Sequence, residues 1–299
     1  MPNLLIAGTL NLDDVETPFG KVQGIMGGSA SFASYAASFF AKPGVVSVIG
    51  RDYPKEYLAL LEQRGIDLSG VEVREKSFRW AGSYEYDMNE AKTLRTELNC
   101  LTEFDPKLPK QYRDATYVFL ANIDPELQLK VVQQVRKPKL IVMDTMNFWI
   151  EHKKDALLEA IKRIDVLVLN DGEARQLFGT PNLVKAAQAA LKLGPKAVII
   201  KKGEHGALLF TDGTHFSAGA YPLETIKDPT GCGDAFAGGF IGWLAKTDDI
   251  SERNMRKAII YGSAIASFNA EDFSLNRLKQ ITEKDIEKRF GEFKEMGEF

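Results

Sequence analysis

Hydrophobic residues in this chain gather in short continuous runs, and each run is followed by a longer stretch of mixed polarity. Apolar runs of this kind predict strands that are buried on both faces of a sheet. Segments with helical spacing lie between most of these runs, which is typical of an α/β protein. The predicted strands are residues 3–10, 44–50, 117–121, 140–143, 166–169 and 197–200.

The alternation of strands and helices predicts a doubly wound, mainly parallel sheet with helices on both faces. In such a sheet, ligands bind beyond the carboxyl ends of the strands. We therefore expect the polar residues that follow the predicted strands, namely Asp13, Asp144, Asn170 and Gly203, to meet at one edge. Predicted helices occupy residues 29–41, 53–64, 155–163, 182–193 and 235–245, and capping residues begin three more at Asp124, Ser251 and Thr282.

Residues 71–101 follow a different pattern, because polar and apolar residues alternate in 71–74 and again in 93–98. Alternation with a period of two predicts strands that have one face in water. We therefore expect a single α/β domain over residues 1–299, with a small β-sheet lid whose strands are inserted from about 11–24 and 71–101.

The composition excludes several other classes of protein. Of the 299 residues, 44% are hydrophobic and 26% are charged, which is ordinary for a globular protein. A net charge of -3 offers no basic surface for nucleic acid, and no apolar run is long enough to cross a membrane. Only two cysteines occur and no secretory signal pattern opens the chain, so the expected location is the cytoplasm.

The segment from Lys227 to Phe240 carries the clearest chemistry. Gly231 and Gly233 let the backbone bend and let a ligand approach closely. A helix of small and apolar residues follows, and its first turn offers unpaired N–H groups to an anion. Asp234 lies in that turn. A site for phosphate and a carboxylate that accepts a proton are thus side by side, which suits phosphoryl transfer to a hydroxyl.

This segment resembles the C-terminal signature of the PfkB (ribokinase-like) family of sugar and nucleoside kinases. The resemblance implies that Asp234 is the catalytic base and that Gly231, Cys232 and Gly233 form an anion hole. Cys232 stands where the family usually has Ala, and its backbone N–H is expected to serve equally well. The matching residues are Asp228, Pro229, Thr230, Gly231, Cys232, Gly233 and Asp234.

Two further segments resemble the family's nucleotide side. Asn170 and Glu173 match its Asn-x-x-Glu motif, which implies that they help to hold Mg²⁺, largely through water, and the phosphates of ATP. By itself, this spacing favours a helix cap with an acidic first turn, and the Lys227–Phe240 segment elsewhere in the chain favours the nucleotide role. The segment from Lys201 to Gly206 resembles the family's glycine loop, although a solvated turn into a hairpin has the same pattern. The nucleotide residues implied are Asn170, Glu173, Lys201, Gly203, Gly206 and Thr230.

The acceptor side is expected near the N-terminus. Asp13 matches the family's substrate-binding Asp, with Asp14 as an alternative, and a carboxylate accepts hydrogen bonds from vicinal hydroxyls. Gly27, Gly28 and Ser29 resemble the N-terminal signature, but Phe32 replaces its usual Asn. That change removes an amide and implies a specificity different from that for ribose or fructose. In the lid, Trp80, Tyr84 and Tyr86 are candidates to stack on a sugar or base, or to form the lid's own core.

The resemblance implies a kinase that uses ATP and Mg²⁺, with K⁺ as a further expected ion, to phosphorylate a hydroxymethyl group of a sugar or related small molecule. A nucleoside kinase of the same family is the first alternative, and a ligand-binding regulator with an inactive site is the second. A dinucleotide oxidoreductase is disfavoured, because no predicted strand is followed by G-x-G-x-x-G. A homodimer through the lid is a further expectation.

Overall fold

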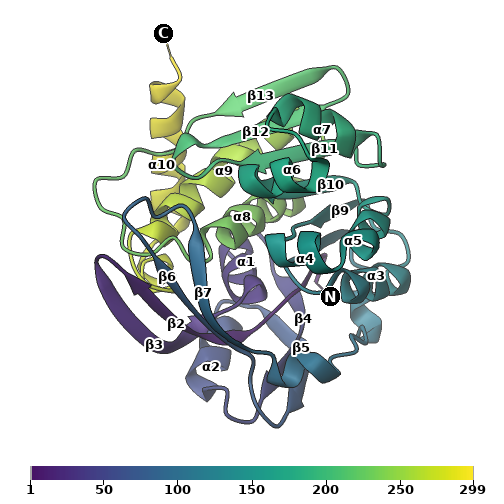
Figure 1. The fold of residues 1–299 in the computed structure, drawn as a ribbon, viewed down its shortest axis with the longest axis vertical. Helices are drawn as coiled ribbons and strands as arrows, with labels where there is room; N and C mark the ends of the chain where they lie inside the picture. Colours follow the sequence, from purple (N-terminus) through teal and green to yellow (C-terminus); the bar gives the residue numbers. More distant parts are fainter. Residues whose placement is uncertain (1, 299) are drawn as a thin grey trace.

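A nine-stranded sheet runs through the computed structural model, which describes residues 2–298 (Figure 1). Neighbouring strands pair in parallel, except that β12 is antiparallel to both of its neighbours. The predicted doubly wound, mainly parallel sheet is therefore confirmed. In spatial order the strands are β13 (Thr214–Ala218), β12 (Ala207–Thr211), β11 (Ala197–Lys201), β10 (Val166–Asn170), β9 (Leu140–Met143), β8 (Tyr117–Leu120), β1 (Leu4–Ala7), β4 (Pro43–Gly50) and β5 (Asp67–Arg74).

The order of the strands reverses beside β1. From β1 the chain moves to β4 and β5 on one side, and it then returns to β8 and the following strands on the other side. In open α/β sheets, ligands bind at such a reversal, outside the carboxyl ends of the strands. The residues that follow β1 and β8 therefore lie where an acceptor site is expected.

Helices cover both faces of this sheet. One face is packed by α1 (Ser29–Ala37), α2 (Lys55–Gln63), α8 (Cys232–Thr247) and α9 (Glu252–Ala270), with α10 (Glu283–Met296) against α9. The other face is packed by α3 (Pro125–Gln134), α4 (Asn147–His152), α5 (Lys154–Ile161), α6 (Asp171–Phe178) and α7 (Leu183–Leu191). Short 3-10 helices are η1 (Asn99–Glu103), η2 (Lys110–Tyr112), η3 (Gly203–His205) and η4 (Leu278–Gln280).

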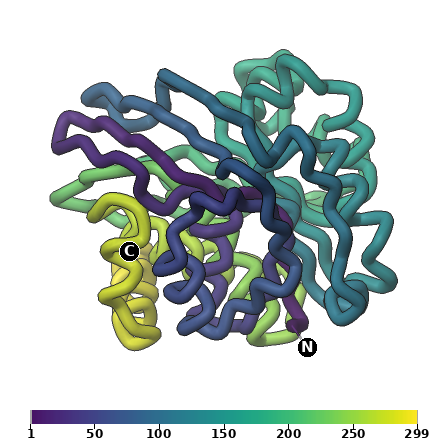
Figure 2. The backbone as a smooth tube through the Cα atoms, turned by 90° about the horizontal axis from the view of Figure 1, so that it is seen from below, coloured from purple at the N-terminus to yellow at the C-terminus, as the bar shows by residue number. Residues whose placement is uncertain are grey.

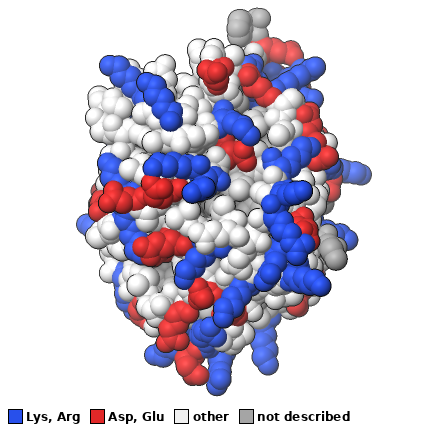
Figure 3. Space-filling model, turned by 90° about the vertical axis from the view of Figure 1, so that its right-hand side faces the viewer, with Lys and Arg blue, Asp and Glu red and all other residues white. Residues whose placement is uncertain are grey.

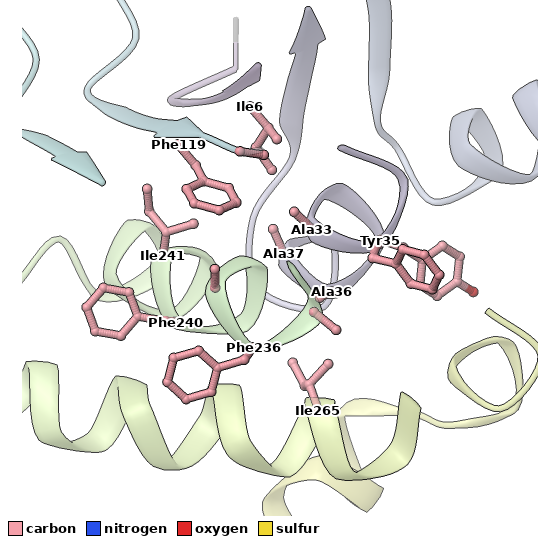
Figure 4. Close-up of a cluster of buried hydrophobic side chains, with 14 of the residues drawn as sticks. Ile6, Ala33, Tyr35, Ala36, Ala37, Phe119, Phe236, Phe240, Ile241 and Ile265 are labelled. Atoms are coloured by element: carbon pink, nitrogen blue, oxygen red, sulfur yellow. The ribbon is translucent and has the colours of Figure 1, made fainter. Parts of the chain in front are cut away.

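Helix α8 is the buried centre of one face, between α1 and α9 (Figure 4). Phe236 and Phe240 of α8 fill the space toward α9. Small residues let the helices approach closely, since a Cβ at Gly238 would lie 2.2 Å from the carbonyl oxygen of Ala33. This packing fixes the start of α8, and the Lys227–Phe240 segment with it, against the sheet.

The predicted caps are confirmed. The Asp124 carboxylate accepts the N–H of Glu126 at 2.9 Å, and the Ser251 hydroxyl accepts the N–H of Asn254 at 3.3 Å. The N–H of Thr282 donates to the Asp285 carboxylate at 2.8 Å. Helix α4 was not predicted. Among residues 2–298, no helix has both the length and the apolar character needed to cross a bilayer.

A second sheet of four strands forms the lid and projects from one side of the molecule (Figure 2). Its order is β3 (Gly20–Gly27), β2 (Asn11–Thr17), β6 (Arg79–Tyr84) and β7 (Ala91–Glu97). Assigning residues 71–74 to this lid was wrong, because they end β5 and pair with β4 in the large sheet. An edge strand with one wet face alternates like a lid strand, and this explains the error.

The two faces of the lid differ in chemistry. In parallel strands, paired residues point to the same face, so Asp13 and its partner Trp80 share one face and Asp14 and Ala81 share the other. On the outer face, Asp14 pairs with Arg95 at 2.9 Å. Elsewhere, the side of the molecule drawn in Figure 3 mixes acidic and basic side chains, as the small net charge predicts.

Candidate active site

Three neighbouring strands deliver polar side chains to one edge of the large sheet. Asp144 follows β9, Asn170 ends β10 and Lys201 ends β11. The ammonium Nζ of Lys201 lies 2.6 Å from Oδ2 of Asp144, and the Asp144 side chain is only 4% exposed. The predicted meeting of these strand ends is confirmed, and it places a buried ion pair at the centre of the site.

Asp234 reaches this ion pair from the first turn of α8 and is partly exposed. Desolvation and, to a smaller extent, the charge of Asp144 raise the pKa of its carboxyl to about 7, against the opposing effect of the Lys201 charge. A carboxylate with a pKa near neutrality is suited to accept a proton from a hydroxyl. The sequence predicted the position of this carboxylate but could not predict its pKa.

The loop from Gly231 to Gly233 turns the chain into α8. Gly231 has a φ of 75°, and a Cβ there would lie 2.4 Å from the ring of Phe32. The N–H of Cys232 donates to the carbonyl of Pro229 at 3.1 Å, and its role in an anion hole stays a prediction. The tight turn at Pro229 uses this donor. The N–H groups of Gly233 and Asp234 lie in the first turn, where a helix has no carbonyl to offer them.

Asn170 and Glu173 form a reciprocal cap at the start of α6. The Asn170 side chain accepts the N–H of Glu173, and Glu173 Oε2 accepts the N–H of Asn170, both at 2.7 Å. Burial raises the pKa of Glu173 to about 8, and Lys201 acts in the opposite direction. The helix cap expected from the Asn-x-x-Glu spacing is therefore observed, next to the ion pair, and the role of these two residues in holding Mg²⁺ stays a prediction.

The residues fit a magnesium ion that is held mainly through water and phosphate. The cap uses Oε2 of Glu173 and leaves Oε1 free of this bond. Within residues 2–298, no group of three or more His, Cys, Asp or Glu side chains is arranged to hold a metal. Mg²⁺ commonly keeps several waters and binds one or two carboxylates together with substrate phosphates.

The glycine loop after β11 is a short 3-10 turn that leads into a hairpin. Gly203 and Gly206 have φ of 54° and 84°, and the N–H of Lys202 donates to the carbonyl of Gly206 at 2.7 Å. The tip of the β6–β7 hairpin reaches this loop, since a Cβ at Gly203 would lie 2.5 Å from Oδ1 of Asn89. The loop therefore forms one wall beside Lys201 and lies under the lid.

Asp13 lies on the inner face of the lid and is 3% exposed. Asn11 donates a side-chain hydrogen bond to its carboxylate, and the backbone of Gly27 lies directly against it. Burial raises the pKa of Asp13 well above its usual value, and the charges of Asp228 and Asp234 contribute. Asp13 is therefore on the side of the lid near Asp228 and Asp234, whereas Asp14 points to the outer face.

The other predicted acceptor residues divide into two groups. Gly27 touches Asp13, and Gly28 takes a φ of 102° at the start of α1. The hydroxyl of Ser29 donates to the carbonyl of Asn122, and the Phe32 ring is 2% exposed and covers Gly231. Ser29 and Phe32 therefore hold neighbouring backbone in place, at Asn122 and at Gly231 respectively.

Thr230 connects the lid to the Lys227–Phe240 segment. Its hydroxyl donates to the hydroxyl of Tyr84 at 3.2 Å, and its N–H donates to Asp228 at 2.8 Å. The buried Asn269 donates to the Thr230 carbonyl at 2.9 Å. Sequence reasoning named neither Asp228 nor Asn269 as a site residue, although a lone Asn on the apolar face of α9 was a usable signal. Tyr86, by contrast, is 89% exposed at the hairpin tip.

A family model described as pfkB family carbohydrate kinase matches residues 6–280. The chain belongs to the pfkB family of carbohydrate kinases. The predicted family is confirmed, and with it the prediction that this kinase is a phosphotransferase with a hydroxyl acceptor. A cytidine kinase of Thermococcus kodakarensis is 31% identical to this kinase over 259 residues, which cover 84% of this chain and 92% of the relative.

Solved structures share the fold of this kinase. A protein described as ribokinase II from E. coli, in complex with ATP and Mg²⁺, has a TM-score of 0.79 at 18% identity and covers 98% of this chain and 100% of its own. A nucleoside kinase of Burkholderia thailandensis in complex with inosine has a TM-score of 0.76 at 19% identity and covers 97% of each chain. These likenesses confirm a ribokinase-like core with a separate small sheet.

Proposed function

We propose that this kinase transfers the γ-phosphate of ATP to a hydroxymethyl group of a nucleoside, with Asp234 as the general base. The observation that carries the proposal is that Asp13 of the lid lies near enough to Asp234 of α8 for the charge of Asp234 to raise the pKa of Asp13. One carboxylate is placed to bind hydroxyls of an acceptor and the other to take a proton from it. The cytidine kinase relative favours a nucleoside, which was the first alternative from the sequence, over a free sugar.

In this proposal, the first turn of α8 stabilises the transferring phosphoryl group. The N–H groups of Gly233 and Asp234 and the positive end of the helix dipole are fixed before the reaction begins. A Cβ at Gly233 would lie 2.9 Å from Nζ of Lys201, so this ammonium is beside the same loop. Lys201 therefore adds a fixed positive charge where negative charge moves from ATP to the acceptor.

Glu173, with Asn170, would hold the metal ion of the nucleotide. When bound, Mg²⁺ would supply positive charge that offsets the charge of the ATP phosphates. The chain's own part is to orient the water around that ion through the free oxygen of Glu173 and to hold the carboxylate still through the reciprocal cap. Gly203, Gly206 and Thr230 are proposed to line the nucleotide side, and Gly27 and Gly28 the acceptor side.

The lid is proposed to exclude water from the reacting groups. Thr230 joins it to the Lys227–Phe240 segment through Tyr84, and the Thr17 hydroxyl donates to the carbonyl of Lys227 at 2.9 Å. Excluding water limits hydrolysis of ATP and strengthens the electrostatic contacts. Dependence on K⁺ and a homodimer through the lid stay predictions.

A phosphorylation screen tests the proposal. Purified kinase with ATP and Mg²⁺ is offered cytidine, uridine, adenosine, inosine and free ribose, and the product is detected as the 5′-monophosphate or the sugar phosphate. We expect kcat/KM to be at least about tenfold higher for one nucleoside than for ribose, a difference of about 1.4 kcal/mol. A preference for ribose would overturn the nucleoside and leave a sugar kinase, while no transfer to any hydroxyl would favour the regulator.

A further inference from the structure

We propose that Trp80 is the surface on which the base of the acceptor stacks, and that Gly82 keeps its indole in position for this contact. This inference rests on the proposed nucleoside acceptor and names the residue that recognises the base. Nucleobases stack on aromatic side chains, and such contacts tolerate different bases because each base has an aromatic face.

The position of Trp80 follows from the register of the lid. Trp80 of β6 pairs with Asp13 of β2 in parallel, so the two side chains leave neighbouring strands on the same face. Neighbouring strands are about 4.8 Å apart. A ribose bound at Asp13 therefore brings its attached base to the strand that carries Trp80. Free ribose bound at the same carboxylate would leave this surface uncovered.

Two contacts hold the indole in place, one with its own strand β6 and one with the neighbouring strand β7. Its six-membered ring covers Gly82, where a Cβ would lie 2.1 Å from the nearest ring carbon. Its Nε1–H donates to the Thr93 hydroxyl of β7 at 3.2 Å. Any larger residue at position 82 would lift the ring from the strand. The side chain is partly exposed, so the surface that does not contact Gly82 is available to a flat ligand.

The neighbouring residues place this surface on the face of the lid that is turned toward the Lys227–Phe240 segment. Tyr84 is four residues after Trp80 on β6 and therefore lies on the same face, and its hydroxyl accepts a hydrogen bond from Thr230. Trp80 thus shares this face with Asp13, which is proposed to bind the ribose, and with Tyr84, which contacts Thr230. The outer face of the same strands carries the ion pair of Asp14 and Arg95, which offers no aromatic surface.

Three variants of the full-length kinase test the inference: Trp80→Leu, Trp80→Phe and Gly82→Ala. Trp80→Leu removes the aromatic face, Trp80→Phe keeps a smaller one, and Gly82→Ala keeps the tryptophan but displaces its ring. Gly291→Ala is the matched control, because a Cβ there meets nothing within 4 Å. Each variant is checked by thermal melting before its kinetics are measured with the preferred nucleoside, ATP and Mg²⁺.

We expect Trp80→Leu and Gly82→Ala to raise the KM of the nucleoside about 5- to 100-fold, with Trp80→Phe in between. The KM of ATP, kcat, and the inhibition constant of free ribose should change by less than about twofold, because Trp80 is proposed to contact only the base. Gly291→Ala should behave as wild type. A structural role for Trp80 would lower kcat and weaken ribose and nucleoside alike.

Folded variants with an unchanged nucleoside KM would overturn the role of Trp80, while the wild-type enzyme would still be a nucleoside kinase. If the wild type phosphorylates no nucleoside, the proposed function fails first and this inference fails with it. An equal loss of affinity for ribose and nucleoside would also overturn it, because Trp80 would then act on the sugar or on the lid.

Discussion

The ammonium of Lys201 is bound to the carboxylate of Asp144 at 2.6 Å, at the ends of two strands that flank β10. The two side chains are 18% and 4% exposed. Attraction to Asp144 and Glu173 outweighs desolvation and raises the pKa of Lys201, so the ammonium stays charged in the site. The pair lies beside Asp234. The negative charge of Asp144 raises the pKa of Asp234, and the positive charge of Lys201 lowers it.

The first prediction is that the two members of this pair shift the pH profile of kcat/KM in opposite directions. Since Lys201 lowers the pKa of Asp234 and Asp144 raises it, Lys201→Met should move the acidic limb to higher pH and Asp144→Asn should move it to lower pH. We expect each shift to be about 1 unit, the lower end for a close charge. The measurement is kcat/KM from about pH 5 to 9 for both variants.

Lys196→Met is the control for this experiment, because Lys196 pairs with Asp165 at 2.9 Å on the far end of the same strands and is 79% exposed. Lys196→Met should leave the acidic limb of the kcat/KM profile at the same pH as in the wild type. Shifts of the same sign for Lys201→Met and Asp144→Asn would show that another group sets the limb. Removing one partner of a buried pair is also expected to cost about 3–5 kcal/mol of stability, so each profile is measured well below the Tm of its variant.

The second prediction concerns Asp234 as the base. Asp234→Asn keeps the size of the side chain but cannot take a proton, so kcat should fall about 10²–10⁴-fold while the KM of ATP changes little. In the wild type, kcat/KM should rise with pH and level off above about 7, because the pKa of Asp234 is raised to about 7. A folded Asp234→Asn enzyme with near-normal kcat would end this mechanism.

The stability of the same variant provides an independent readout. A carboxyl whose pKa is raised in the folded state stabilises the fold below its unfolded pKa, and that contribution is lost as pH rises through the folded value. For Asp234 this pH window runs from the ordinary carboxyl pKa of 3.8 to the raised pKa of about 7. Asp234→Asn should therefore melt at or above the wild type at pH 8. An Asp that only capped α8 would instead cost about 0.5–2 kcal/mol on replacement.

Much of the fold could be predicted because local patterns determine it. The runs at β8, β9 and β10 are uninterrupted and apolar, and these strands are buried as expected. Caps at Asp124 and Ser251 act within one turn of helix, so a few residues carry the signal. The lid boundary at β5 failed because an edge strand and a lid strand present the same alternation, and only long-range pairing separates them.

The sequence predicted where the site residues lie in the fold but not which of their side chains contact one another. Strand ends and the Lys227–Phe240 segment placed Asp13, Asp144, Asn170 and Asp234 at one edge. Whether Lys201 would pair with Asp144 or face solvent depends on the two crossovers that bring β9, β10 and β11 together, which no local pattern records. In the same way, the hydrogen bond from the Cys232 N–H to the Pro229 carbonyl depends on the conformation of the turn, which the sequence did not predict.

The third prediction assigns the acceptor to Asp13. Asp13→Ala should raise the KM of the acceptor by about 10- to 150-fold, as the loss of a charge-assisted hydrogen bond of about 1.5–3 kcal/mol requires. The KM of ATP should stay nearly unchanged. Asp14→Ala is the matched control, because this neighbouring carboxylate points to the outer face and pairs with Arg95. If Asp14→Ala raised the acceptor KM and Asp13→Ala did not, the assignment of the two faces would be wrong.

The fourth prediction concerns the metal ion. Activity should be lost with excess EDTA and should return with Mg²⁺, because the phosphates carry more charge than two backbone N–H groups can stabilise. Glu173→Gln is a clean test, since glutamine can still accept the N–H of Asn170 in the cap but cannot offer a carboxylate to the ion. We expect a fall in kcat, a higher Mg²⁺ concentration for half-maximal activity and an unchanged acceptor KM.

The control for Glu173→Gln is Asp171→Asn, which removes a negative charge from the same helix turn. Asp171 pairs with Arg175 on the surface, and its side chain is 37% exposed. If loss of charge near the N-terminus of α6 were enough to weaken magnesium, both variants would raise the Mg²⁺ requirement equally. If Glu173 acts through its position beside Lys201 and Asp144, only Glu173→Gln will do so. An unchanged Mg²⁺ requirement in Glu173→Gln would remove Glu173 from the metal site and leave it as a helix cap.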